Sequence, residues 1–316
     1  MTDQGLDRRD FLKAVAATGA ALAVGCQKPA APAVTAPAAG PAVGEPAPPP
    51  PPDSRPERSR VVLVRDQAAL GPDGQPDPAV LARMLDDGVV ALLGAAAPAM
   101  AWGELFRPGE VVGIKSNVWR FIPVPAALEE LLRARVQAAG VAAADVAIDD
   151  RGVLENPVFQ RATALLDVRT LRTHHWSGIG SCLKNYIMFS PEPSSWHEDA
   201  CADLGGLWEL PIVRGKTRLC IQVALTPLFH GKGPHHYSAE YTWAYGGLIL
   251  GRDPVAVDAV AVRLLEAKRR LHFGKDEPFA VSPKHVRVAQ DKYRLGWADP
   301  ERIELVKLGW SEGALI

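Results

Sequence analysis

The side chains best suited to acid–base chemistry near neutral pH are histidine and, where its pKa is lowered, lysine. Lys115 directly follows an apolar run of strand type, an unusual place for a charge without a role. His174 and Lys184 lie further along, in a polar stretch of the chain. We expect Lys115, His174 and Lys184 to be ligand or acid/base groups, with the carboxylates of Asp149 and Asp258 orienting them.

Polar residues that could hold a ligand occur where two expected strands end. Asn117 stands just after the first of these strands and Arg151 just after the second. In open parallel sheets, ligands bind at the carboxyl ends of the strands, and an arginine there can pair with a carboxylate or a phosphate. The alternative is a set of solvated loop charges. The expected ligand-binding residues are Asn117, Arg151, Asn185 beside Lys184, and Asp253, whose simplest role is a helix N-cap.

Six of the eight histidines fall between His174 and His236. Imidazoles gathered in this way suit zinc, copper or iron, so a transition-metal site is one hypothesis. The chain has no HExxH or CxxC motif and no regular ligand spacing, and the alternative is histidines that line a polar cleft. The candidate metal ligands are His174, His197, His230 and His235.

Three cysteines share this histidine-rich section, namely Cys182, Cys201 and Cys220. In an oxidising compartment, the simplest expectation is one disulfide and one buried free thiol. A thiolate metal ligand is the alternative. An iron–sulfur cluster is not expected, because the close cysteine spacing that it requires is absent.

The elements that position these residues alternate between strand and helix. Strands are expected near residues 61–64, 111–114, 146–148, 168–173, 217–224, 245–250 and 303–308, and helices over 77–93, 125–139, 157–166, from 253 and from 282. This order predicts an α/β fold with a largely parallel sheet, helices on both faces and an irregular His/Cys-rich insertion. Residues 59–316 are expected to form a single α/β domain.

The N-terminus has the features of an export signal. Arg8 and Arg9 are followed by an uncharged run rich in Ala and Gly, which resembles a twin-arginine signal over residues 1–28. That resemblance implies recognition by the twin-arginine machinery, which carries folded proteins. The tetrapeptide ending at Cys26 resembles a lipobox, so Cys26 is an expected lipid anchor to the membrane; the alternative is an ordinary cleaved signal.

Composition separates a linker from the domain and excludes one class of partner. Eleven of the 28 prolines lie between Pro29 and Pro56, so residues 29–58 are expected to form an extended Ala/Pro-rich linker. With 35 basic and 36 acidic residues, the chain has a formal net charge of -1 and no basic segment for nucleic acid. The expected location is the periplasm or cell envelope.

Several segments together resemble the family known as domain of unknown function 362. They are Lys115-Ser116-Asn117, Asp149-Asp150-Arg151, Leu171-Arg172-Thr173-His174, Leu183-Lys184-Asn185 and the run from Gly251 to Ala261. The resemblance spans roughly residues 105–310. Residues 225–240 depart from the acidic segment that the family often has there. The family has no settled activity, so the resemblance implies the place of a site rather than a reaction.

Two functions are compatible with these observations. The first is an exported, lipid-anchored enzyme, metal-dependent or redox-active, that acts on a small polar or anionic ligand. The second is a non-catalytic binding or accessory lipoprotein that uses the same cleft. Lysine, histidine and aspartate gathered together exceed what simple capture needs, which favours the enzyme.

Overall fold

The computed structural model describes residues 55–231 and 237–316. The chain divides into two units, Met1–Pro51 and Pro52–Ile316, and every described residue belongs to the second. The expected signal, most of the linker, Cys26 and His235 therefore lie outside the described residues. No helix in the described ranges combines the length and the apolar character that crossing a membrane requires.

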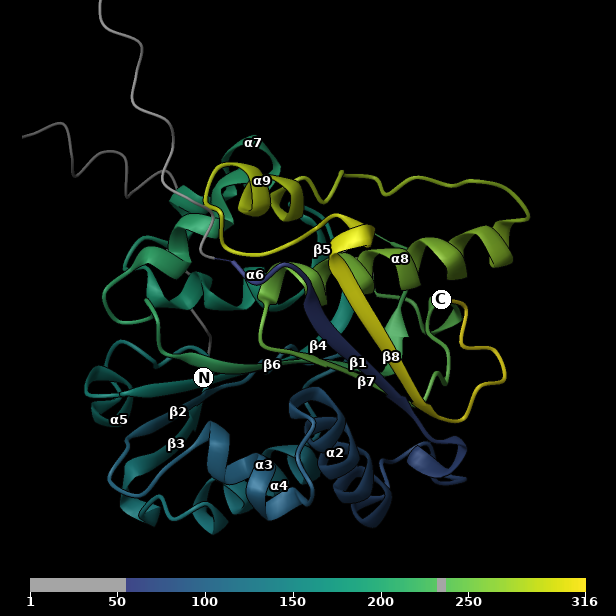
Figure 1. Ribbon diagram of the computed structural model, residues 1–316. Coiled ribbons are helices and arrows are strands. Elements are labelled where there is room, and N and C mark those ends of the chain that lie inside the picture. The colour runs from purple at the N-terminus through teal and green to yellow at the C-terminus, as the bar shows by residue number, and fades with distance from the viewer. Residues whose placement is uncertain (1–54, 232–236) are drawn as a thin grey trace, which may run out of the picture. The chain divides into compact units, whose positions relative to one another are not determined.

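One mixed, mostly parallel sheet forms the centre of the domain (Figure 1). Its strands follow the order β3-β2-β4-β6-β7-β1-β8, and β5 pairs with β4 outside this path. The pairs β2–β3, β2–β4, β4–β6 and β1–β8 are parallel, whereas β7 is antiparallel to both β6 and β1. The strands are β1 Ser59–Arg65, β2 Val112–Lys115, β3 Val146–Asp149, β4 Ala164–His174, β5 Gly178–Gly180, β6 Thr217–Leu228, β7 Gly247–Gly251 and β8 Ile303–Gly309.

Helices cover both faces of the sheet, as the alternation of elements predicted. The helices α2 Pro78–Leu93, α3 Pro98–Leu105 and α4 Ala126–Ala138 lie on one face, at the bottom of Figure 1. The helices α8 Pro254–Phe273 and α9 His285–Asp291 lie on the other. Successive residues of β1 enter opposite hydrophobic cores, Val62 towards α2 and Val61 towards α8, because side chains alternate along a strand.

Local capping explains where the two longest helices begin and end. Asp77 accepts hydrogen bonds from the backbone amides of the first turn of α2, and Asp253 does the same for α8. Each helix then has proline in its first turn, where an amide proton is not needed. Gly94 and Gly274 end them in the left-handed conformation that glycine adopts without strain.

One expected helix is shorter than predicted. The helix predicted over residues 157–166 is limited to α5, Pro157–Gln160, and β4 begins at Ala164. The reason is sheet pairing, because the amides of Thr163 and Ala164 both bond to the carbonyl of Val111 beside β2. The helix ends after one turn because the residues that follow pair with the sheet instead.

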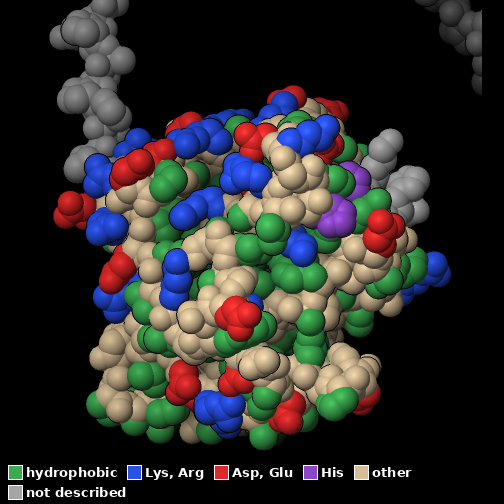
Figure 2. Space-filling view, turned by 90° about the vertical axis from the view of Figure 1, so that its right-hand side faces the viewer, with side chains coloured by type: hydrophobic (Ala, Val, Ile, Leu, Met, Phe, Trp, Pro, Cys, Tyr) green, Lys and Arg blue, Asp and Glu red, His purple; other side chains and the backbone are tan. Residues whose placement is uncertain are grey.

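The irregular middle section consists of short helical turns between β5 and β6. The helices α6 Cys182–Asn185 and α7 Glu198–Cys201 belong to it, with 3-10 turns at 186–189, 193–197 and 202–209. Three successive residues, Asp199, Ala200 and Cys201, have positive φ angles. On the face of the molecule drawn in Figure 2, Lys and Arg side chains gather over the half that carries α8 and α9.

Candidate functional site

A cavity of about 250 Å³ opens at the carboxyl ends of β2, β3 and β4. We call it the strand-end pocket. Pairing of β2 with β4 stops at Lys115 and Asp167, and β4 continues beyond that point to His174. The pocket lies along this continuation. Its lining includes Asn117, Asp150, Arg151, Arg169, Arg172, His174, Lys184, Asn185 and His197, together with Trp119 and Trp176.

Two arginines of β4 dominate the charge of the pocket. Arg169 and Arg172 are each 4% exposed, and neither forms a salt bridge with a carboxylate of the described residues. Their hydrogen bonds are long, 3.4 Å from Arg169 to the carbonyl of Ser181 and 3.4 Å from Arg172 to that of Thr173. Both Nε atoms are buried without a hydrogen-bond partner. Burial lowers the pKa of both guanidinium groups, and the nearby carboxylate of Asp150 opposes this shift without forming a salt bridge to either.

A break in the sheet register brings these arginines to one pocket. Side chains three residues apart on a regular strand project from opposite faces. The pairing of β4 with β6 shifts between Thr170 and Arg172, so β4 is irregular between the two arginines. Arg172 also lies over the ring of Trp119, with 4.3 Å between its guanidinium carbon and the ring centroid.

Lys184 supplies a third cation from the short helix α6. Burial lowers its pKa to about 8, and its Nζ lies 3.7 Å from the Sγ of Cys201. His174 lines the pocket beside it, and burial with the neighbouring cations lowers its pKa well below the usual value. Its Nδ1 accepts a hydrogen bond of 3.2 Å from the amide of Trp176. The structure therefore brings His174 and Lys184 to one cavity.

Asp258 holds α6 in place rather than facing the pocket. Its carboxylate accepts hydrogen bonds from the Ser181 hydroxyl at 2.6 Å and from the amides of Cys182 and Leu183 at 2.9 and 3.0 Å. The two amides have no partner within the helix because they stand at its start, so Asp258 caps α6 from a different helix. Burial raises its pKa to about 7. Asp258 lies among the buried apolar residues of α8, and this capping role accounts for a carboxylate at that position.

Lys115 is fully buried and already paired. Its Nζ donates to Asp150 at 2.6 Å and to the carbonyl of Ser116 at 2.7 Å. Asn185 connects this pair to α6, since its Oδ1 accepts from Lys115 at 3.4 Å and its Nδ2 donates to Asp167 at 2.6 Å. Lys115 thus stands behind the pocket wall, where it fixes Asp150 and Asn185.

Two predicted site residues have local structural roles. Asp149 accepts hydrogen bonds from the Gly152 amide and the Asn156 side chain and so closes the turn after β3. Asp253 caps α8 and also accepts from the Ser59 hydroxyl and the Trp297 amide. Neither lines the strand-end pocket. Asn117 and Arg151 do line it, and the Oδ1 of Asn117 is buried without a partner.

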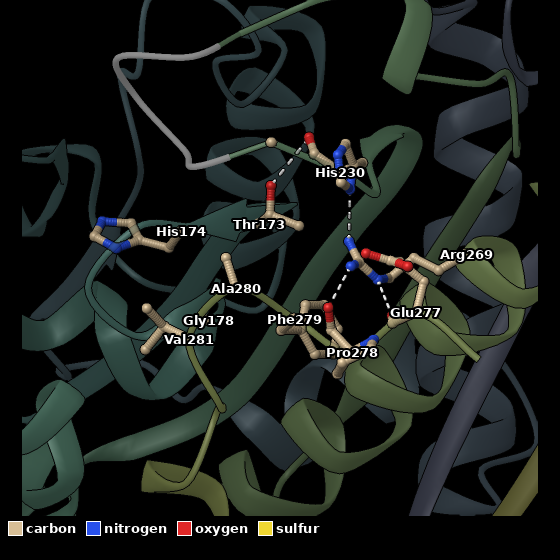
Figure 3. Close-up of a pocket in the computed structure, with 11 residues that line it drawn as sticks. Thr173, His174, Gly178, His230, Arg269, Glu277, Pro278, Phe279, Ala280 and Val281 are labelled. Carbon is tan, nitrogen blue, oxygen red and sulfur yellow. Dashed lines mark hydrogen bonds between the residues drawn. The ribbon is translucent and has the colours of Figure 1, made fainter. Parts of the chain in front are cut away.

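The four histidines proposed as metal ligands are spread over several places. His174 and His197 line the strand-end pocket. His230 lies in a neighbouring cavity of about 150 Å³, where its ring contacts Arg269 at 3.2 Å. His174 lines this cavity as well, on the side away from His230 and Arg269 (Figure 3). Arg269 is held there by carbonyls, including that of Pro278. His235 is outside the described residues, so the histidine metal site stays a prediction.

The expected disulfide is wrong, because Cys182, Cys201 and Cys220 are all free and buried thiols. Cys201 faces Lys184 instead of another sulfur. Cys182 and Cys220 lie close together with Asp167, and the three ligand atoms are all within 4.8 Å of one another. Among the described residues, these three form the group of at least three His, Cys, Asp or Glu side chains that could hold a metal ion.

Sequence reasoning missed Arg169, Arg172 and Asp167. All three lie inside β4, every residue of which is buried. A signal was present, because charged residues inside an otherwise apolar strand need a partner or a ligand. The strand was expected only over 168–173, which leaves Asp167 outside it and Arg169 and Arg172 one residue from its ends, whereas β4 extends over Ala164–His174.

The geometry defines an α/β protein with a cationic pocket at the carboxyl ends of parallel strands. Comparison with known families then identifies two segments. Residues 153–263 match the family model described as "Domain of unknown function (DUF362)", and residues 5–25 match the twin-arginine translocation pathway signal sequence. The chain thus carries a DUF362 domain, which contains β4, α6 and Asp258, and is exported by the twin-arginine pathway. No curated protein and no solved structure matches the chain.

Proposed function

We propose that this exported protein binds a small organic anion, a carboxylate or phosphate compound, in the strand-end pocket and acts on it as an enzyme. The observation that carries the proposal is the pair of buried arginines, Arg169 and Arg172, which have no salt-bridge partner among the described residues. Burying a charged group away from water costs several kcal/mol in folding free energy unless an opposite charge compensates it. An anionic ligand would provide that compensation.

The pocket suits a small ligand with an apolar part. Its volume of about 250 Å³ lies just below the usual range for ligand sites, which begins at about 300 Å³. Arginine binds carboxylate and phosphate groups with two parallel hydrogen bonds, and Arg169 and Arg172 both have an unused Nε donor. The indole rings of Trp119 and Trp176 offer apolar surface beside these donors.

Lys184 and His174 are the groups that we propose for acid–base chemistry, since both line the same pocket as the arginines. Lys115, Asp149 and Asp258 support them from outside the pocket, as positioning residues. Asn117, Arg151 and Asn185 are proposed ligand contacts. The alternative is a non-catalytic binding protein, in which the anion is held by the arginines and released unchanged.

Titration calorimetry with phosphate, sulfate and a panel of di- and tricarboxylates tests the binding step. We expect Arg172→Gln and Arg169→Gln each to weaken binding by about tenfold or more, because a hydrogen bond to a charged group is worth about 1.5–3 kcal/mol. Arg83→Gln is the matched control, since Arg83 pairs with Asp66 on the surface. Equal affinity in all three variants would remove the arginines from the site.

Two substitutions of Lys184 separate the enzyme from the binding protein. Lys184→Arg keeps the positive charge but removes a group that exchanges protons near neutral pH. Once a bound anion is identified, we expect Lys184→Arg to retain binding and to lose turnover of that anion. Turnover that persists in Lys184→Arg would exclude the acid–base role, and absence of turnover in the unsubstituted protein would favour the binding protein.

Lipid anchoring at Cys26 is part of the same proposal. The support is the resemblance of residues 23–26 to a lipobox behind the matched export signal. Membrane fractionation of the full chain with Cys26→Ser tests it. We expect the substituted protein to move to the soluble envelope fraction, and retention in the membrane would show that another feature anchors the chain.

A further inference from the structure

We propose that Asp167, Cys182 and Cys220 form a buried site for one divalent transition metal ion of the zinc type, behind the strand-end pocket. Two thiolates and a carboxylate are ligands that zinc accepts in proteins. This site differs from the histidine set suggested by the sequence. It also stands independently of the anion-binding function, because none of its three residues lines the strand-end pocket.

Three separate segments converge on this site. Asp167 comes from β4, Cys182 from α6 and Cys220 from β6, and each is 0% exposed. Their ligand atoms lie within 4.8 Å of one another. In a tetrahedral site with bonds of about 2.0–2.3 Å, ligand atoms are roughly 3.5–3.8 Å apart, so metal binding requires only a modest contraction.

The carboxylate of Asp167 is half satisfied. Its Oδ1 accepts a hydrogen bond of 2.6 Å from Asn185, whereas its Oδ2 is buried with no hydrogen-bond partner. A metal ion would bind the free oxygen. The bond from Asn185 is then the kind of outer contact that fixes a ligating carboxylate in known metal sites.

Gln222 offers a fourth ligand from β6. Its Oε1 lies 3.5 Å from the Sγ of Cys182, and its Nε2 is buried without a partner. The amide oxygen would complete four-coordination without water. A site closed in this way is structural rather than catalytic, because a catalytic zinc keeps an open position.

Charge balance is compatible with this assignment. Binding of M²⁺ to two thiols releases two protons and leaves a centre of net charge −1 when the Asp167 carboxylate is counted. Lys115 and Arg169 are buried cations that interact electrostatically with Asp167. Lys115 would compensate the remaining negative charge, whereas Arg169 also lines the strand-end pocket and is available to an anion there.

Export by the twin-arginine route is compatible with a metal site that is fully enclosed by the protein. A fully enclosed site must be filled as the chain folds, and this route carries proteins that have already folded. The metal would therefore be acquired in the cytoplasm, where thiols stay reduced. Once filled, it would tie α6 to β4 and β6 and so fix the segment that carries Lys184.

Elemental analysis of the full-length exported protein tests the site. We expect one zinc-type metal ion per chain in the unsubstituted protein and a loss of at least tenfold in metal content for Cys220→Ala. Cys201→Ala is the matched control, because Cys201 is equally buried and free but outside the group, and it should keep its metal. Metal that persists in Cys220→Ala would overturn the proposal.

A spectroscopic measurement on the unsubstituted protein covers the case in which Cys220→Ala does not fold. Protein produced in medium with Cd²⁺ or Co²⁺ should show the ultraviolet charge-transfer absorption of a metal–thiolate bond. Metal-free protein that has three free thiols, or a disulfide between Cys182 and Cys220, would overturn the site. Anion affinity is measured separately, so failure here would leave the proposed function untouched.

Discussion

The two faces of the central sheet differ in what they bury. Beneath the sheet, α2, α3 and α4 pack on a core of apolar side chains, and the ion pair between Arg135 of α4 and Asp86 of α2 remains 29% and 17% exposed. Above it, the region of α6 and α8 encloses Lys115, Asp167 and Asp258 at 0% exposure. Burying a charged side chain costs folding free energy unless the charge is paired. The concentration of buried charge on one side of the sheet therefore marks that side as the candidate functional side.

The largest effect should come from breaking the buried pair on the polar side. Lys115→Met leaves the buried carboxylate of Asp150 without its lysine partner, and we expect a loss of about 3–5 kcal/mol in unfolding free energy. Urea denaturation measures it. Lys115→Met combined with Asp150→Asn should recover part of the loss. A single substitution that costs less than the double would contradict this account of the pair.

A large-to-small change on the apolar side should destabilise without touching the site. Leu85 is 0% exposed in α2, and Leu85→Ala should cost about 3 kcal/mol through lost burial and the cavity that remains. Urea denaturation gives the cost, and calorimetry at low temperature gives the anion affinity of the folded fraction. We expect that affinity to stay within twofold of the original. A large fall in affinity would show that the two sides are coupled.

The cap that α8 provides for α6 should show a smaller cost in stability and a clear effect on binding. Asp258→Asn keeps the size of the side chain but replaces one accepting oxygen by a donor, and we expect a loss of about 2 kcal/mol. Because α6 carries Lys184, anion affinity should fall as well. Unchanged affinity together with lower stability would mean that α6 keeps its position without the carboxylate.

The smallest effect is expected for an ordinary cap on the apolar side. Asp77→Ala removes the hydrogen bonds to the Ala79 and Val80 amides at the start of α2 and should cost about 1 kcal/mol. Thermal denaturation measures the change, and anion binding should not respond. A loss as large as that of Asp258→Asn would remove the distinction between the two caps.

The sequence predicted the apolar side better than the polar side, for a physical reason. Helix α2 follows from an N-cap, a proline and an apolar periodicity that are all local. The strand-end position of Asn117 and Arg151 was also predictable, since it depends only on where strands end. The roles of Lys115 and Asp258 depend on partners 35 and 75–77 residues away, which no local pattern encodes.

The same limit applies to the arginines and cysteines. Arg169 and Arg172 share a pocket because of an irregular register between β4 and β6, which depends on both strands. Cys182 and Cys220 meet because α6 packs beside β6, and the expectation of a disulfide came from counting cysteines without this geometry. Residue types indicated which side chains could form a site, but tertiary pairing decided which of them lie together.

The cap on α6 also sets an order of assembly. A helix of four residues, Cys182–Asn185, has no stability of its own, because helix nucleation is unfavourable. Its first amides are bound only when Asp258 arrives from α8, more than seventy residues later in the chain. Lys184 therefore takes its place only after α8 has been synthesised and has packed against α6. Because the protein leaves the cytoplasm already folded, this step precedes export.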